Sequence, residues 1–234
     1  MIFLHVVLLS ANLITFACSS HQSSCDEDCA DKPVFTPSQL VVEYGAAASV
    51  SCTPCQHGCR QDQAGMDASA GETARNDTAV LWTVDSVAEF NLSATCFYAK
   101  DDGSRCCSRL PITVYKPPTR VSLSFKQEEY YSGYESKVQC SVEDVAPIGN
   151  VQLIFYSSFL PVFHHQFSDS SVSPESGSYT LTVRSLEESD GSGYWCEANL
   201  RLGPEGPATV LKYASKIRRD HRPPPFIVQS SGDR

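Results

Sequence analysis

Apolar and polar residues alternate with a period of two in several short stretches of this 234-residue chain. Val138, Cys140 and Val142 take alternate positions, and residues 179–183 repeat the pattern. Alternation of this kind is typical of strands that bury one face. The same criterion predicts strands at residues 40–42, 49–52, 80–84 and 112–115, with Trp82 in the core. We therefore expect an all-β protein.

The residues before Cys196 indicate which all-β fold this is. Asp190 stands six positions before Cys196, and Tyr194 stands two before it. In immunoglobulin-type sandwiches a Tyr at this position closes the E–F corner, and the Cys crosses to strand B. Cys140, on the alternating stretch upstream, is the expected partner. The predicted fold is two tandem immunoglobulin-like antiparallel β-sandwiches, rich in disulfides.

The chain divides into four segments. Residues 1–19 are uncharged and largely apolar, which is typical of a secretory signal peptide and too short for a comfortable membrane span. Residues 25–115 form the first expected sandwich and residues 119–215 the second, separated by Pro117 and Pro118. Residues 216–234 are expected to be a linker and the possible start of a third domain, so that the chain is a fragment of a longer product.

Removal of Cys18 with the signal peptide leaves ten cysteines, the even number expected of a disulfide framework in an oxidising compartment. Cleavage after Ala17 would instead retain Cys18 and leave an odd number of cysteines. Cys52 and Cys96 are the expected pin of the first sandwich. The other six allow fifteen pairings, and three placements narrow them: Cys25 and Cys29 precede strand A, Cys106 and Cys107 precede the adjacent strand G, and Cys55 and Cys59 flank the B–C loop.

Composition excludes several classes of function. The net charge of −9 argues against a nucleic-acid partner, because phosphates require Lys and Arg. No nucleophile motif of a hydrolase occurs. Cys52-Thr-Pro-Cys55 follows a strand and precedes no helical pattern, which disfavours thiol-redox chemistry. His164 and His165 are more typical of a polar strand or turn than of a metal site. We expect no enzyme activity, cofactor or small-molecule substrate.

Two sequons, at Asn76 and Asn91, predict N-glycosylation of the first domain.

Three stretches resemble the intercellular adhesion molecule family of the immunoglobulin superfamily. They are the doubled cysteine Cys52–Cys55 with its short run to Cys96, the junction Leu110–Pro118, and the segment Tyr194–Pro207. The resemblance covers nearly all of residues 25–215. It implies a glycoprotein of the leukocyte or endothelial surface whose first domain binds a leukocyte integrin.

The resemblance also implies one acidic residue, at or just after the end of strand C, that completes the coordination of the integrin's Mg²⁺ ion. Mg²⁺ accepts carboxylate oxygen and leaves other positions to water. The matching stretch makes Asp67 the candidate, with Met66 beside it as a contact. Glu72 is an alternative acid and Asp62 a weaker one. A homodimer is possible.

The alternative hypothesis is a structural or homophilic immunoglobulin protein, or a soluble decoy, in which Asp67 is an ordinary surface residue. The sequence leaves open which integrin would bind.

Overall fold

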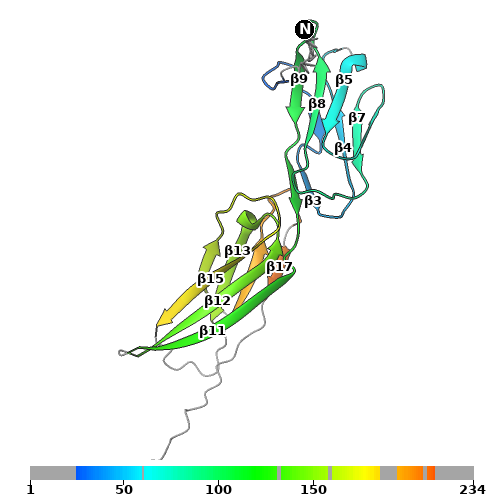
Figure 1. The fold of residues 1–234 in the computed structure, drawn as a ribbon. Helices are drawn as coiled ribbons and strands as arrows, with labels where there is room; N and C mark the ends of the chain where they lie inside the picture. Colours follow the sequence, from blue (N-terminus) through cyan, green and yellow to red (C-terminus); the bar gives the residue numbers. More distant parts are fainter. Residues whose placement is uncertain are drawn as a thin grey trace, which may run out of the picture.

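A computed structural model describes residues 25–59, 61–130, 133–157, 160–184, 194–207 and 210–213. The expected signal peptide, the segment 216–234 and the turn residue Asp190 lie outside these residues. Strands β1–β10 fall within residues 25–115 and strands β11–β17 within residues 120–213, in two sandwiches that lie end to end (Figure 1). The predicted all-β, two-sandwich architecture is confirmed.

The first sandwich is built from two sheets, of order β2-β4-β7-β6 and β1-β9-β8-β5, and a parallel pair of β3 with β10. The predicted strands at 40–42, 49–52, 80–84 and 112–115 are all present, as β3, β4, β7 and β10. A 3-10 turn, η1, precedes β5. The bounds are β1 (Cys25–Asp26), β2 (Val34–Thr36), β3 (Leu40–Glu43), β4 (Ala48–Thr53), η1 (Gln61–Gln63), β5 (Ala64–Ala68), β6 (Glu72–Arg75), β7 (Val80–Val84), β8 (Ala94–Ala99), β9 (Arg105–Arg109) and β10 (Ile112–Tyr115).

Trp82 forms the centre of the first core, as its place in an alternating strand predicts. Its side chain is fully buried, together with the Cys52–Cys96 bridge that joins the two sheets. The indole Nε1 donates a hydrogen bond to the carbonyl oxygen of Ala70 at 2.8 Å. A buried indole N–H needs such a partner, because an unsatisfied donor in an apolar core is costly.

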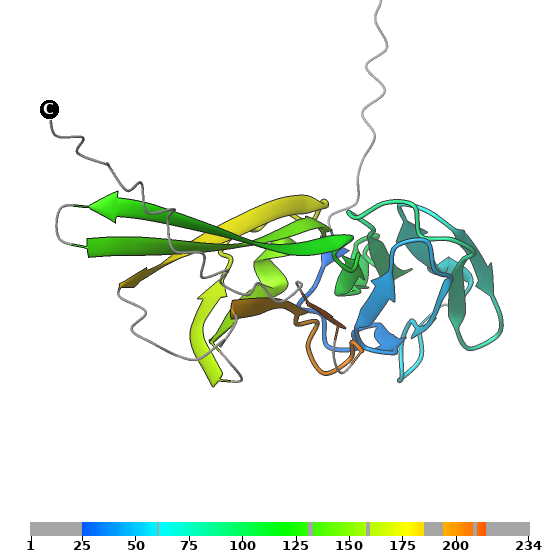
Figure 2. The same cartoon turned by 90° about the horizontal axis from the view of Figure 1, so that it is seen from below.

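The second sandwich packs a sheet of order β11-β12-β15 against one of order β14-β13-β16-β17. Seen from below, β11 and β12 (green) form a long antiparallel pair that extends away from the first sandwich (Figure 2). The bounds are β11 (Arg120–Tyr130), β12 (Gly133–Val145), η2 (Ile148–Asn150), β13 (Val151–Ser157), β14 (Leu160–Gln166), β15 (Glu175–Arg184), β16 (Tyr194–Leu200) and β17 (Val210–Tyr213).

The Cys140–Cys196 bridge crosses the second core from β12 to β16, as predicted. Val138 and Val142 are fully buried on either side of Cys140, which confirms the buried face of that strand. His164 and His165 lie on β14, and His165 stacks on Tyr179 with ring centroids 4.2 Å apart. Partial burial lowers the pKa of His165.

Lys116 ties the two sandwiches together. Its backbone exchanges two hydrogen bonds with Ala146, at 2.9 and 3.1 Å, and its Nζ lies 2.7 Å from Oδ2 of Asp144. Tyr115, the last residue of β10, is buried in the core of the second sandwich, and Val41 packs against the same core. The junction therefore combines a short stretch of strand pairing with apolar packing.

The five disulfides pair all ten cysteines from Cys25 onward, and they resolve the pairings that the sequence left open. Cys25 pairs with Cys107, Cys29 with Cys106, and Cys55 with Cys59. The expectation that Cys106 and Cys107 precede strand G is wrong. Both lie inside β9, because the G edge is divided by Leu110 and Pro111 into β9 and β10. The two bridges therefore staple the segment before β2 directly to a strand.

Among the described residues, no helix is long and apolar enough to cross a membrane.

The nested bridges Cys25–Cys107 and Cys29–Cys106 should be redundant in stability. Loss of either one, by Cys→Ala at both of its ends, leaves almost the same loop closed and should cost about 1 kcal/mol of lost packing. Loss of both opens a loop that spans 82 residues, which should lower the free energy of unfolding by about 3–5 kcal/mol.

Urea unfolding of the three variants measures these values. Removal of Cys55–Cys59, whose ends are 4 residues apart, is the control for a bridge that restricts the unfolded chain little. Redundancy would be contradicted if the decreases in the free energy of unfolding for the two single-bridge variants add up to the decrease for the variant that lacks both bridges.

Candidate functional site

Asp67 projects from the outer face of the first sandwich. It is the fourth residue of β5, an edge strand that pairs only with β8 within its four-stranded sheet. Because side chains alternate along a strand, Ala64 and Met66 point into the core, and Gly65 and Asp67 point outward. The Asp67 side chain is 70% exposed. Since β5 pairs with β8, which carries Cys96, β5 is strand C of the sandwich. The candidate acid therefore stands near the end of strand C, the position that the family resemblance implies.

Met66 cannot serve as the expected contact beside Asp67. Its side chain is 8% exposed and belongs to the core cluster that surrounds Trp82. The physical reason is the period of two: neighbours in one strand face opposite sides of the sheet. The assignment of Met66 to the binding surface is corrected to a core role.

The alternative acids lie elsewhere. Glu72 is the first residue of β6 in the opposite sheet, where it pairs with Thr83 and is exposed on the other face. Asp62 lies in the turn η1, before β5. Neither is brought together with Asp67, so the three acids do not form one cluster.

Arg105 contacts Asp67 and lies over the ring of Phe97, and sequence reasoning missed both residues. Nη1 of Arg105 lies 3.4 Å from Oδ2 of Asp67, and the guanidinium carbon lies 4.1 Å from the centroid of the Phe97 ring. A signal was available for Phe97: the sequence predicts Cys96 as the buried pin, and alternation along a strand turns its neighbour outward, as the structure has it. An exposed ion pair of this kind contributes only about 0–1 kcal/mol to stability. Its significance lies in where it holds the carboxylate.

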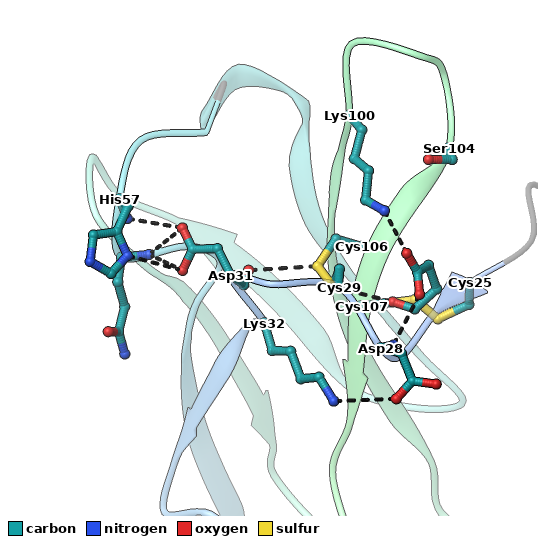
Figure 3. Close-up of a disulfide and its surroundings, with 12 residues drawn as sticks. Cys25, Asp28, Cys29, Asp31, Lys32, His57, Lys100, Ser104, Cys106 and Cys107 are labelled. Atoms are coloured by element: carbon teal, nitrogen blue, oxygen red, sulfur yellow. Dashed lines mark hydrogen bonds and ion pairs between the residues drawn. A yellow bond between two sulfur atoms is a disulfide. The ribbon is translucent and has the colours of Figure 1, made fainter.

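Two disulfides and several ion pairs fix the edge of the sheet beside Arg105 (Figure 3). The short strand β1 pairs in parallel with β9, with Cys25 opposite Arg105. Nζ of Lys100 lies 2.5 Å from Oδ2 of Asp26. This contact holds the pKa of Asp26 below its ordinary value and raises the pKa of Lys100. The pKa of Asp102 is lowered by two hydrogen bonds from Ser104.

Asp31 holds the loop that contains the Cys55–Cys59 bridge. Its carboxylate accepts the backbone N–H of Gln56, at 2.9 Å to Oδ1, and that of His57, at 2.9 Å to Oδ2 (Figure 3). These bonds stabilise the ionised form and hold the pKa of Asp31 below its ordinary value. The loop that contains Cys55 and Cys59 is thus held by hydrogen bonds to Asp31 as well as by its disulfide.

The predicted glycosylation sites are both exposed. Oδ1 of Asn76 accepts the backbone N–H of Thr78 at 3.0 Å and that of Ala79 at 2.7 Å, in the turn between β6 and β7. Asn91 lies between β7 and β8, two residues before Ser93, whose backbone oxygen accepts the N–H of Ser69 at 3.0 Å.

In the part of the chain that the structure describes, no group of three or more His, Cys, Asp or Glu side chains could hold a metal ion. Asp67 itself is an exposed carboxylate, and a carboxylate oxygen is a ligand that Mg²⁺ accepts.

No model of a known protein family matches the chain. Among solved structures, it is similar to the ICAM-5 D1–D4 ectodomain fragment, with a TM-score of 0.56 and 18% identity over 79% of this chain and 49% of the fragment. It is also similar to bovine butyrophilin, with a TM-score of 0.52 and 12% identity over 80% of this chain and 99% of that one. The chain spans about half the length of the ICAM-5 fragment. At these identities the likeness establishes the immunoglobulin-like fold alone.

The tie between Asp31 and its loop should depend on pH in a defined direction. A carboxyl whose folded pKa is lowered stabilises the fold fully above the ordinary pKa of an aspartate, and it loses that contribution as the pH falls through the lower folded pKa. We expect the protection of the Gln56 and His57 amides against hydrogen exchange to persist down to about pH 4 and to fall below it.

Asp31→Ala should remove that protection at neutral pH. Asp28→Ala is the matched control, since the Asp28 side chain is exposed and its Oδ1 lies 3.7 Å from Nζ of Lys32. Exchange measured by NMR that is equal in the wild type and Asp31→Ala would refute the tie.

Proposed function

We propose that this chain belongs to an extracellular cell-adhesion glycoprotein of the intercellular adhesion molecule type, and that Asp67 binds a leukocyte integrin. The carboxylate would complete the coordination of the Mg²⁺ ion that the integrin holds. The observation that carries the proposal is the position of Asp67: an acid 70% exposed, on the outer face of the first sandwich, near the end of strand C.

The physical chemistry of the site supports this role. Mg²⁺ binds through one or two carboxylates and keeps several waters, so one well-placed Asp is enough to join two proteins at a metal. A rigid support lowers the entropic cost of binding. Asp67 lies on a sheet that disulfides hold, since the adjacent strand β8 carries Cys96 and the next strand, β9, carries Cys106 and Cys107.

The fold likeness alone does not select this function, because butyrophilin matches about as well as ICAM-5. The sequence features add the preference. The segment Leu110–Pro118 includes β10 and the junction at Lys116, and the segment Tyr194–Pro207 includes β16 and the turn after it. Glycans at Asn76 and Asn91 are part of the proposal, as is a location at the cell surface.

Adhesion of leukocytes to the purified chain, presented as an antibody Fc fusion, tests the proposal. We expect adhesion in Mg²⁺ that is lost in EDTA and lost in Asp67→Ala, because both remove the shared metal bond. Glu72→Ala is the matched control: it removes an exposed acid from the opposite sheet and should leave adhesion unchanged.

Adhesion that is lost in EDTA but retained by Asp67→Ala would support an integrin as the partner and would assign the metal-binding acid to another residue. Adhesion that is unaffected by EDTA would refute the metal mechanism.

A second candidate function, self-association, is favoured by one observation. Residues 25–115 hold 13 acidic and 6 basic side chains, so two copies repel one another at most approaches. The outer face of the sheet β2-β4-β7-β6 is different. Its centre is uncharged: Leu81 on β7 is 42% exposed and lies in register with Ser51 and Ala74. Val34, on the edge strand β2, is also 42% exposed. A contact between two copies at this centre opposes no like charges, because the exposed Glu72 lies at the edge of the sheet, on β6.

Leu81→Asp should therefore shift a dimer toward monomer by introducing like charges into the contact. Sedimentation equilibrium over a range of concentrations measures the shift. Leu160→Asp, at a leucine 72% exposed in the second sandwich, is the control. A wild-type chain that stays monomeric throughout would eliminate this function.

A further inference from the structure

We propose that Arg105 is a positioning residue for Asp67: its guanidinium, laid across the Phe97 ring, holds the carboxylate in the orientation that binds the partner's metal. This inference rests on the proposed function and adds to it the side chains that prepare the acid.

We call the Arg105 side chain that lies over the Phe97 ring the arm, and it depends on a glycine in β5. Gly65 lies directly opposite Phe97 in the pairing of β5 with β8. A Cβ built at position 65 would lie 2.9 Å from Cζ of Phe97, closer than carbon atoms normally approach. The missing side chain lets the Phe97 ring lie across β5 on the outer face of the sheet. The ring thereby becomes a platform between β9 and the Asp67 carboxylate.

Arg105 uses this platform to reach an acid that is not its nearest neighbour in register. Across the sheet, Asp67 aligns with Thr95 and then with Arg109, whereas Arg105 aligns with Ala99. The Arg105 side chain must therefore run diagonally over β8. Its guanidinium carbon stands 4.1 Å from the ring centroid of Phe97, and its Nη1 stands 3.4 Å from Oδ2 of Asp67.

The backbone at the base of the arm is covalently held. Cys106 and Cys107 follow Arg105 directly and are bonded to Cys29 and Cys25. Cys25 is also the register partner of Arg105 in the parallel pair of β1 with β9. A long side chain is thus extended from a fixed origin over a fixed ring. Few conformations remain to it.

The contact leaves the acid competent to bind. Arg105 approaches Oδ2, and within the described residues no hydrogen bond or ion pair engages Oδ1. One oxygen of the carboxylate can face a metal while the other stays with the guanidinium. Holding one side chain in advance removes an ordering cost that corresponds to roughly two- to tenfold in affinity.

Arg109 provides a matched control on the same strand. It carries the same charge, is in register with Asp67 through Thr95, and is paired with Glu27 at 3.7 Å rather than with Asp67. Arg109→Ala removes one positive charge from this face and leaves the arm intact.

The experiment measures leukocyte adhesion in Mg²⁺ to the full chain, as the coating density that gives half-maximal binding. Arg105→Ala should raise that density roughly two- to tenfold, Phe97→Leu should raise it in the same direction, and Arg109→Ala should leave it unchanged. EDTA should abolish adhesion to every variant. Thermal melting checks that each variant is folded.

Equal effects of Arg105→Ala and Arg109→Ala would overturn the proposal in favour of a general charge effect. Stronger adhesion by Arg105→Ala would overturn it too, since Arg105 would then compete with the metal.

A second measurement does not depend on the partner. Three-bond NMR couplings to Cγ of Asp67 report its χ1 torsion, and we expect a single rotamer in the wild type and in Arg109→Ala, with averaged couplings in Arg105→Ala. Unchanged couplings in Arg105→Ala would overturn the proposal that Arg105 positions Asp67. If Asp67→Ala keeps metal-dependent adhesion, the proposed function fails at this acid, and the couplings still decide whether Arg105 orients it.

Discussion

The covalent attachment of the N-terminal segment to β9 is the constraint on which the first sandwich depends. Strand β1 has two residues, and an isolated pairing of that length is too short to hold a chain against its conformational entropy. Cys25–Cys107 and Cys29–Cys106 supply what the pairing lacks. They add a strand to the β5-β8-β9 sheet, and they fix the backbone of β9 at the position from which Arg105 extends. The N-terminal segment and the candidate site are therefore both held by the two disulfides to β9.

The contacts around Asp67 follow from packing that begins inside the domain. Met66 is buried, which turns Asp67 outward, and Cys96 is buried, which turns Phe97 outward. Gly65 then gives the ring room, and the ring gives Arg105 a surface to cross. A cation near an aromatic face is attracted to it even when partly exposed. The orientation of the acid is in this way a consequence of the core.

Much of this could be predicted from sequence, and the failures have definite causes. The position of Cys140 in an alternating strand predicted its bridge to Cys196, and Trp82 was predicted in the core for the same reason. The segments that the extra cysteines join followed from the adjacency of strands A and G. Their pairing did not, because Cys25 and Cys29 can each pair with either of the adjacent Cys106 and Cys107, and the sequence does not distinguish the two arrangements. Met66 failed because residues 64–68 show no clear alternation, so the strand that sends it inward was unrecognised. Arg105 reaches Asp67 along a diagonal, and a diagonal contact depends on sheet twist and on the space above Gly65.

The two faces of the first sandwich have opposite character, and this bears on how the candidate functions relate. The β5-β8-β9 face presents Asp67 with arginines around it, while the centre of the opposite sheet is uncharged. A partner on one face does not obstruct a second copy on the other. If both surfaces are used, the copies in a dimer carry their acids on outward sheets, and two moderate metal bonds then act together at one cell surface. Linked binding of this kind exceeds either single affinity by about 10²–10⁴ when the geometry permits both contacts. Self-association and metal-dependent adhesion would in that case be two parts of one function.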